Sequence, residues 1–255
     1  MNIKFDFSGK VALVTGASSG IGRATAELFG ASGASVAIVY HRNERGANET
    51  IEKIREGGAR AIAIQADFTR NADVFAAVER TQNELGAVDV LINNAGSLVE
   101  RLRTADLTEE RWDEVFALNT KSAFFAAKAV IPAMLEKGAG VIVNVSSIAG
   151  RNGGALGSIH YSAAKGAVIT MTKGLAKEFA ASGIRVNAVS PGVIDTPFHE
   201  TFSTPEAMLN FAKIIPQGRV GTSAEVAAVI AFLASDAASY LCGETIEING
   251  GMIMD

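Results

Sequence analysis

The chain is poor in the residues that form disulfide bonds and metal sites. It contains one cysteine, Cys242, which cannot form an internal disulfide and lies in an apolar stretch typical of a protein core. Its three histidines are not clustered with acidic residues or with the cysteine, so no metal site is predicted. We therefore expect a protein of a reducing compartment, the cytoplasm, with no bound metal.

Positive charge and long apolar runs are also scarce. The formal net charge is -4 at pH 7, which gives no electrostatic reason to bind nucleic acid or an anionic membrane. No run approaches the roughly 18 to 20 uncharged apolar residues of a membrane span. Residues 1–10 are charged and lack the apolar region of a signal peptide. These features predict a small-molecule substrate, with no nucleic acid and no membrane as partner.

Apolar residues, by contrast, are abundant and follow a regular pattern. They form 48% of the 255 residues, enough for a large core. Apolar runs alternate with helical stretches along the chain, and the stretch Val11-Ala-Leu-Val14 is apolar throughout, as in strands covered on both faces. The expected strands are 11–15, 35–40, 60–66, 88–93, 140–146, 184–190 and 244–248; the expected helices are 20–32, 44–56, 71–85, 108–136, 158–181 and 223–233.

This alternation predicts an α/β fold with a doubly wound parallel sheet of seven strands, a Rossmann fold. No linker or repeat interrupts it, so residues 1–255 are expected to form a single domain. The least regular region is 192–221, which contains Pro197, Pro205 and Pro216. Long excursions of this kind are often lids, and we expect a substrate lid at about 193–221.

A glycine-rich turn follows the first expected strand and leads directly into a helix. Glycines let such a turn approach a pyrophosphate, and the helix N-terminus presents free N–H groups to the anion. The alternative, an ordinary strand-to-helix turn, is less favoured because of this placement. The candidate cofactor-binding residues here are Gly16, Ser18, Ser19, Gly20, Ile21 and Gly22.

The end of the second strand bears on the choice between NADP and NAD. Dinucleotide folds place the group that reads the adenosine ribose here, and an acidic residue would favour NAD. This chain instead has Tyr40, His41 and Arg42, which offer a donor and a permanent positive charge to a 2′-phosphate. We favour NADP over NAD, although His41 and Arg42 could simply be solvated residues before the next helix.

Five motifs in order resemble those of the short-chain dehydrogenase/reductase family. They are the 15–22 turn, Asn93-Asn94-Ala95-Gly96, Ser146-Ser147, Tyr161-Ser-Ala-Ala-Lys165 and Pro191-Gly192, and the match runs from residue 9 to residue 251. The resemblance implies a sheet of order 3-2-1-4-5-6-7. It also implies cofactor contacts for Asp67 and Phe68 beside the adenine, for Asn94, Ala95 and Gly96, and for Pro191, Gly192, Ile194 and Thr196 at the nicotinamide end. Asn119 matches the family's structural and proton-relay position.

Tyr161 and Lys165 stand four residues apart on an expected helix, so their side chains share one face. The pKa of a free tyrosine is about 10, and we expect the nearby ammonium to lower the pKa of Tyr161. Tyr161 would then donate its proton to a ketone oxygen while Ser147 hydrogen-bonds that oxygen. Ser146 is the competing assignment for the hydroxyl. Without the other motifs, the Tyr–Lys pair would be an unremarkable aromatic beside a surface lysine.

These residues predict an oxidoreductase that interconverts a ketone and a secondary alcohol, with Tyr161 and Lys165 also touching the cofactor. Arg151, Asn152 and His160 favour a sugar-derived or hydroxylated ketone, whereas Phe198, Phe202 and Phe211 favour a more apolar one. The alternatives are a 3-oxoacyl thioester reductase, although Ser97-Leu98-Val99-Glu100 departs from that pattern, and a non-catalytic nucleotide-binding protein. His199 could contact substrate or lie on the surface. The interval from Ser147 to Tyr161 is one residue longer than in many relatives.

Helices 108–136 and 158–181 carry more small and apolar residues than one buried stripe requires. A second buried face is implied, and the C-terminal residues 249–255 could cover a neighbouring subunit. We predict a homotetramer, with a dimer as second choice. The alternative is that these residues fill a large core against the sheet.

Overall fold

The computed structural model describes residues 5–254, so residues 1–4 of the segment examined for a signal peptide, and the C-terminal Asp255, lie outside the described residues. Its main sheet has seven parallel strands in the order β3-β2-β1-β4-β5-β6-β9. The strands are β1 (Val11–Thr15), β2 (Ser35–Tyr40), β3 (Ala61–Gln65), β4 (Val90–Asn93), β5 (Gly140–Val145), β6 (Ile184–Pro191) and β9 (Thr245–Ile248). The single-domain Rossmann fold expected from the sequence is confirmed.

Strand β1 shows why the central strands are apolar throughout. It pairs with β2 on one side and with β4 on the other, so its backbone bonds are shared across the sheet. All five of its residues are buried, because helices cover both faces. Burial on both faces explains why the sequence of this strand is apolar without interruption.

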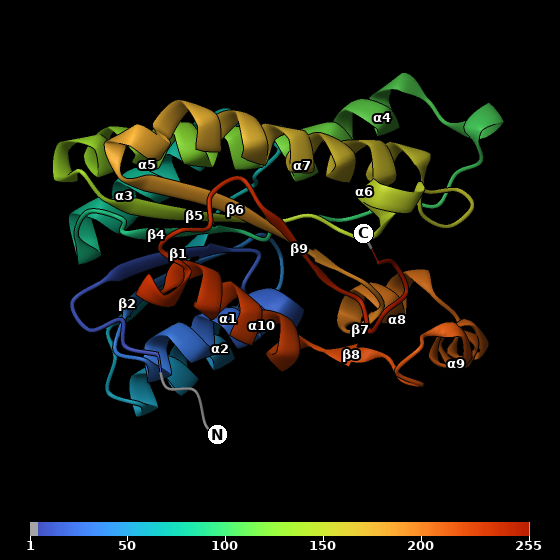
Figure 1. Ribbon diagram of the computed structural model, residues 1–255, viewed down its shortest axis with the longest axis horizontal. Helices are drawn as coiled ribbons and strands as arrows, with labels where there is room; N and C mark the ends of the chain where they lie inside the picture. The colour runs from blue at the N-terminus through green and yellow to red at the C-terminus, as the bar shows by residue number, and fades with distance from the viewer. Residues whose placement is uncertain (1–4, 255) are drawn as a thin grey trace.

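Two layers of helices enclose the sheet (Figure 1). One face is covered by α1 (Gly20–Ala31), α2 (Glu44–Glu56) and α10 (Ser223–Ala234), and the other by α3 (Asn71–Leu85), α5 (Ser122–Lys137) and α7 (Ile159–Phe179). Each layer has its own core, with Phe29 and Ile230 on the first face and Met134 and Leu175 on the second. No helix within residues 5–254 is long and apolar enough to cross a membrane.

The expected helix 108–136 is interrupted in the structure. It consists of α4 (Glu109–Phe116), a five-residue π-helical segment (Ala117–Lys121) and α5. Such π turns occur as short interruptions inside α-helices, and the single helix predicted from the sequence did not include one. Thr120 within this segment donates a hydrogen bond to the Ala164 carbonyl of α7, 2.9 Å away. The interruption thus lies against the helix that carries Tyr161.

The segment expected to be irregular is largely folded. It forms β7 (Ile194–Asp195), α8 (Pro197–Phe202), α9 (Pro205–Ile214) and β8 (Gly221–Thr222), with β7 and β8 paired as a small separate sheet. Pro197 and Pro205 each stand at the first position of a helix, where a missing N–H group costs nothing. Two of the three prolines that suggested irregular structure are therefore helix starts, and the third, Pro216, lies in a turn after α9.

Candidate active site

Two cavities lie at the carboxyl ends of the strands. The Tyr161 cavity, about 390 Å³, and the Tyr40 cavity, about 830 Å³, share Gly16 and Gly96 as lining residues and so lie side by side. Of the residues predicted to bind cofactor, the first cavity is lined by Gly16, Ser19, Gly20, Ile21, Asn94, Gly96, Tyr161, Lys165, Pro191, Gly192, Ile194 and Thr196. The second is lined by Gly16, Ser18, Tyr40, His41, Arg42, Asp67, Phe68, Ala95 and Gly96.

Gly22 is the one predicted cofactor residue that lines neither cavity. A Cβ at this position would lie 2.4 Å from the Gly16 carbonyl oxygen, so its glycine is required by close packing within the turn. Asn94 holds the same turn from the other side, because its side-chain amide donates to the carbonyls of Thr15 and Gly16 at 2.8 and 3.0 Å. The turn is thereby fixed at the first turn of α1, where N–H groups face an anion.

The Tyr40 cavity has the features expected of an adenosine site. The Arg42 side chain is exposed and has no ion pair or hydrogen bond within the described residues. Burial acts to raise the pKa of Asp67, but hydrogen bonds from Thr69 and the charges of His41 and Arg70 outweigh it and leave this pKa below its usual value. Asp67 is therefore ionised at neutral pH and 3.9 Å from His41.

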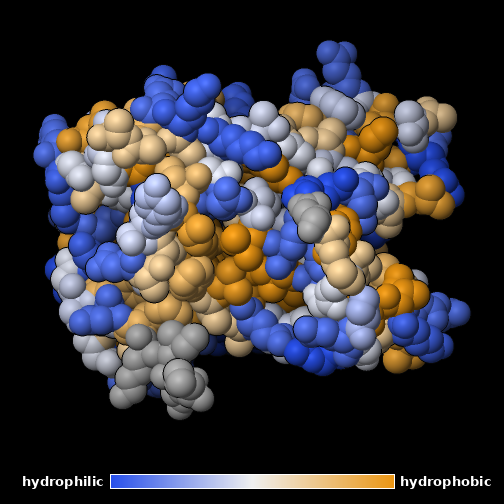
Figure 2. Space-filling model, in the orientation of Figure 1, coloured by the Kyte–Doolittle hydropathy of each residue, from blue (hydrophilic) through white to orange (hydrophobic). Residues whose placement is uncertain are grey.

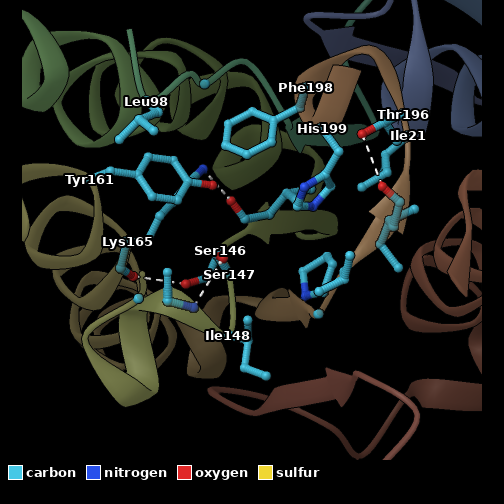
Figure 3. A pocket seen from close by; sticks show the side chains of 18 of the residues that line it. Ile21, Leu98, Ser146, Ser147, Ile148, Tyr161, Lys165, Thr196, Phe198 and His199 are labelled. Carbon is cyan, nitrogen blue, oxygen red and sulfur yellow. Dashed lines mark hydrogen bonds between the residues drawn. The ribbon is translucent and has the colours of Figure 1, made fainter. Parts of the chain in front are cut away.

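Helix α7 places Tyr161 and Lys165 on one face, as their spacing predicts. The Lys165 ammonium lies 5.7 Å from the centre of the Tyr161 ring and donates a 2.8 Å hydrogen bond to the Val145 carbonyl at the end of β5. Figure 3 shows Tyr161, Lys165 and Ser147 around the same cavity, with Phe198 and His199 opposite. The structure therefore brings together the residues that the sequence assigned to proton transfer.

The pKa of Tyr161 does not shift in the direction expected from its neighbour. Burial raises it to about 12, although a hydrogen bond with Ser147 acts to lower it. Burial also lowers the pKa of Lys165 to about 8. The sequence analysis considered the charge of Lys165 and not the desolvation of the tyrosine, and desolvation is the larger effect here. Tyr161 is consequently a protonated group at neutral pH, the form that can donate.

Asn119 is buried in the π-helical segment and bonds to the chain after the Asn94–Gly96 turn. Its amide donates to the carbonyls of Ser97 and Val115, and its oxygen accepts from the Ser97 N–H. A Cβ on Gly96 would lie 2.5 Å from the Asn119 oxygen and 3.0 Å from the Lys165 ammonium. The side chains of Asn119 and Lys165 thus both lie close to Gly96, a residue that lines both cavities.

Only some of the residues predicted to select the substrate line the Tyr161 cavity. Asn152, Phe198, His199 and Phe211 line the Tyr161 cavity, whereas Phe202 does not. Arg151, which forms an ion pair with Glu247, does not, and neither does fully buried His160, whose ring bonds to the Glu100 carbonyl. The interval between Ser147 and Tyr161 contains helix α6 (Ala149–Asn152) and a following turn.

Sequence reasoning missed Leu98, Arg101, Ile148 and Met252, which also line this cavity. None has a motif or periodic signal, because each reaches the cavity through the path of a loop or of the C-terminal tail. Within residues 5–254, no group of three or more His, Cys, Asp or Glu residues is arranged to hold a metal ion.

Comparisons with known proteins agree with this geometry. The family model described as Enoyl-(Acyl carrier protein) reductase matches residues 16–253. The chain is 41% identical over 248 residues to the 3-oxoacyl-(acyl-carrier-protein) reductase FabG of Salmonella typhimurium, covering 97% of this chain and 99% of the relative. It is 40% identical over 262 residues to the 3beta-hydroxysteroid dehydrogenase 1 of Eggerthella lenta, covering 98% and 95%.

A solved structure from Sinorhizobium meliloti 1021, described as a short-chain alcohol dehydrogenase, superposes with a TM-score of 0.92. It is 36% identical in sequence, and the match covers 98% of both chains.

Proposed function

The chain belongs to the short-chain dehydrogenase/reductase family and is an NAD(P)-dependent oxidoreductase that interconverts ketones and secondary alcohols. On this basis we propose that it is an NADPH-dependent ketone reductase in which Tyr161 is the proton donor. The observation that carries the proposal is the Tyr161 hydroxyl, hydrogen-bonded to Ser147 and one helical turn from Lys165, in a cavity that shares Gly16 and Gly96 with the Tyr40 cavity.

In the proposed reaction the bound nicotinamide supplies the hydride. Tyr161 donates its proton to the carbonyl oxygen as negative charge develops there, and Ser147 holds that oxygen by a hydrogen bond. The Lys165 ammonium stabilises negative charge left on Tyr161. Asn119 is proposed to hold the Ser97 backbone and, with it, the floor of the cavity between Gly96 and Lys165.

The preference for NADPH is supported by the Tyr40 cavity. The position that would carry an acidic group in an NAD enzyme is Tyr40, and the free guanidinium of Arg42 lies next to it. Guanidinium groups bind phosphate through paired hydrogen bonds, so Arg42 suits the 2′-phosphate of NADPH.

The walls of the Tyr161 cavity support a ketone with an apolar body. Leu98, Ile148, Phe198, Phe211 and Met252 line it. Of the three residues on which a sugar-like substrate was predicted, Asn152 lines it, whereas Arg151 and His160 lie outside it. We therefore propose an apolar ketone in preference to a sugar-derived one. A 3-oxoacyl thioester is the second candidate, supported by the names of the relatives that are 41% identical.

Two apolar surfaces support the proposal of a homotetramer. On the α4–α5 side, Trp112, Phe124 and Leu135 are exposed, and Phe124 borders a groove between α5 and α7. On the other side, Phe232 of α10 is exposed, and Figure 2 shows apolar side chains gathered where α10 and the edge strand β9 lie. Two such surfaces allow two two-fold contacts, which give a tetramer.

The chain contains a single cysteine, Cys242, which fits a reducing compartment. We therefore propose that the enzyme is cytoplasmic.

The proposed function is tested by following NADPH oxidation with apolar aryl ketones, sugar-acid ketones and 3-oxoacyl thioesters. Reduction of at least one ketone class at a rate well above the cofactor-only control is the expected result. Stable binding of NADPH with no turnover of any class would instead support a non-catalytic nucleotide-binding protein.

A further inference from the structure

Arg101 lies at the opening of the Tyr161 cavity, and we propose that it binds an anionic group on the substrate. This inference rests on the proposed function and narrows its substrate to a ketone with a remote carboxylate or phosphate. Arg101 is exposed and lines the cavity together with residues of α6 and α8. In Figure 2 the surface is hollowed between the part that contains α6 and the part that contains α8 and α9.

The charge around the cavity favours an anion. Within residues 5–254, no Asp or Glu lines the Tyr161 cavity, although the chain as a whole has a net charge of -4. Lys165 is buried and already bonded to the Val145 carbonyl. His199 stays uncharged at neutral pH, because burial and the charge of Arg101 lower its pKa against the opposing effect of Asp195. Arg101 is therefore the accessible positive charge of this cavity.

The guanidinium of Arg101 is held in place while keeping donors for a ligand. Its Nε donates to the Phe202 carbonyl at 2.9 Å, and one terminal nitrogen donates to the Leu156 carbonyl at 3.3 Å. These bonds leave further N–H donors in the planar fork that pairs with carboxylate or phosphate. Because the side chain is already positioned, little conformational entropy is lost when an anion binds.

Aromatic rings connect the proton donor to the segment that holds Arg101. The Tyr161 and Phe198 rings are 5.7 Å apart between centres, and Phe198 and Phe202 are 4.9 Å apart. Arg101 is bonded to the carbonyl of Phe202, at the far end of this row. A substrate that reaches both groups needs an apolar spacer between its ketone and its anionic group.

Two matched pairs of ketones test this assignment. The first is 4-acetylbenzoate and its neutral methyl ester, and the second is 4-acetylphenyl phosphate and neutral 4-methoxyacetophenone. We expect kcat/KM to be about tenfold or more higher for at least one anion than for its neutral partner. The pair with the larger ratio identifies carboxylate or phosphate as the group that Arg101 binds.

Variants of Arg101 show whether that ratio depends on its guanidinium. Arg101→Gln is expected to bring the anion-to-neutral ratio of kcat/KM close to one, and Arg101→Lys to keep part of it. Arg103→Gln removes the same charge from an exposed residue that does not line the cavity, and its ratio is expected to match the wild type. If Arg101 only fastens Leu156 and Phe202, both members of each pair will lose activity equally, and the proposal is overturned.

Calorimetric binding of the four ketones to the protein with NADPH separates this inference from the proposed function. Anion binding that is lost in Arg101→Gln, without turnover of any ketone, would keep the anion site and reject the reductase. Turnover of neutral ketones, with no preference for anions in rate or affinity, would keep the reductase and reject the anion site.

Discussion

Ser146 and Ser147 are neighbours in the chain, yet their hydroxyls have different partners. The Ser146 hydroxyl is buried and donates to the Lys165 carbonyl at 2.8 Å, so it ties the end of β5 to α7. The Ser147 hydroxyl accepts from the Ala149 N–H and is hydrogen-bonded to the Tyr161 side chain. One serine thus supports the backbone beside the site, and the other faces the proposed proton donor.

We predict that alanine substitutions separate these two roles. Ser147→Ala is expected to lower kcat for ketone reduction on the order of a hundredfold, with little change in Tm, because a donor to the developing charge is lost. Ser146→Ala is expected to lower the free energy of unfolding by about 1 kcal/mol while keeping most of the turnover. Steady-state kinetics and thermal unfolding of both variants measure this. The opposite pattern would make Ser146 the catalytic hydroxyl.

The lowered pKa of Lys165 predicts the alkaline limit of ketone reduction. The ammonium is present below pH 8 and is lost as the pH rises through its pKa of about 8, whereas Tyr161, with a pKa of about 12, stays protonated throughout this range. The kcat/KM for reduction should therefore fall above about pH 8. In Lys165→Arg the charge persists, so the fall should move to a higher pH. If kcat/KM falls at the same pH in the wild type and in Lys165→Arg, a group other than Lys165 causes the fall.

The choice of cofactor is expected to depend on Tyr40 and Arg42. The double variant Tyr40→Asp, Arg42→Ala places a carboxylate near the ribose and removes the cation beside the 2′-phosphate. Its kcat/KM ratio for NADPH over NADH should fall by about tenfold or more. Arg45→Ala serves as the control, because exposed Arg45 pairs with Glu49 and does not line the cavity. An unchanged ratio in the double variant would contradict the NADPH assignment.

The homotetramer predicts that each apolar surface can be disrupted separately. Light scattering coupled to size-exclusion chromatography should give four chains of 26.5 kDa for the wild type. A charge in either surface, Phe124→Glu or Phe232→Glu, should give dimers, since burying an unpaired carboxylate is costly. Leu209→Glu on α9, also an exposed apolar site, should leave the mass unchanged. A wild-type monomer at micromolar concentration would reject the assembly.

Features with a local pattern could be predicted from the sequence. The runs of β1 and β2 and the glycine turn at Gly16 indicate strand, turn and helix directly, and the spacing of Tyr161 and Lys165 fixes their common face. The sheet order followed from the family resemblance. These features depend on residues close together in the chain or on motifs in a known order.

Features that depend on distant packing could not be predicted in the same way. The π-helical segment around Asn119 lies within a stretch predicted as one helix. Arg101 lines the cavity and is bonded to the carbonyls of Leu156 and Phe202, which are distant from it in the sequence. The direction of the pKa shift of Tyr161 depends on how deeply the tyrosine is buried, which the spacing to Lys165 does not reveal.

The proton donor is tested most directly by Tyr161→Phe, which removes one oxygen and keeps the ring beside Phe198. We predict that its kcat for ketone reduction falls on the order of a hundredfold to ten-thousandfold, the range for loss of a general acid. Its Kd for NADPH should stay within about threefold of wild type, because the ring and Lys165 remain. NADPH oxidation and NADPH binding, measured on the same preparations, give both quantities. Retention of more than about a tenth of the wild-type kcat, a fall smaller than general-acid loss produces, would contradict the assignment of Tyr161 as the proton donor.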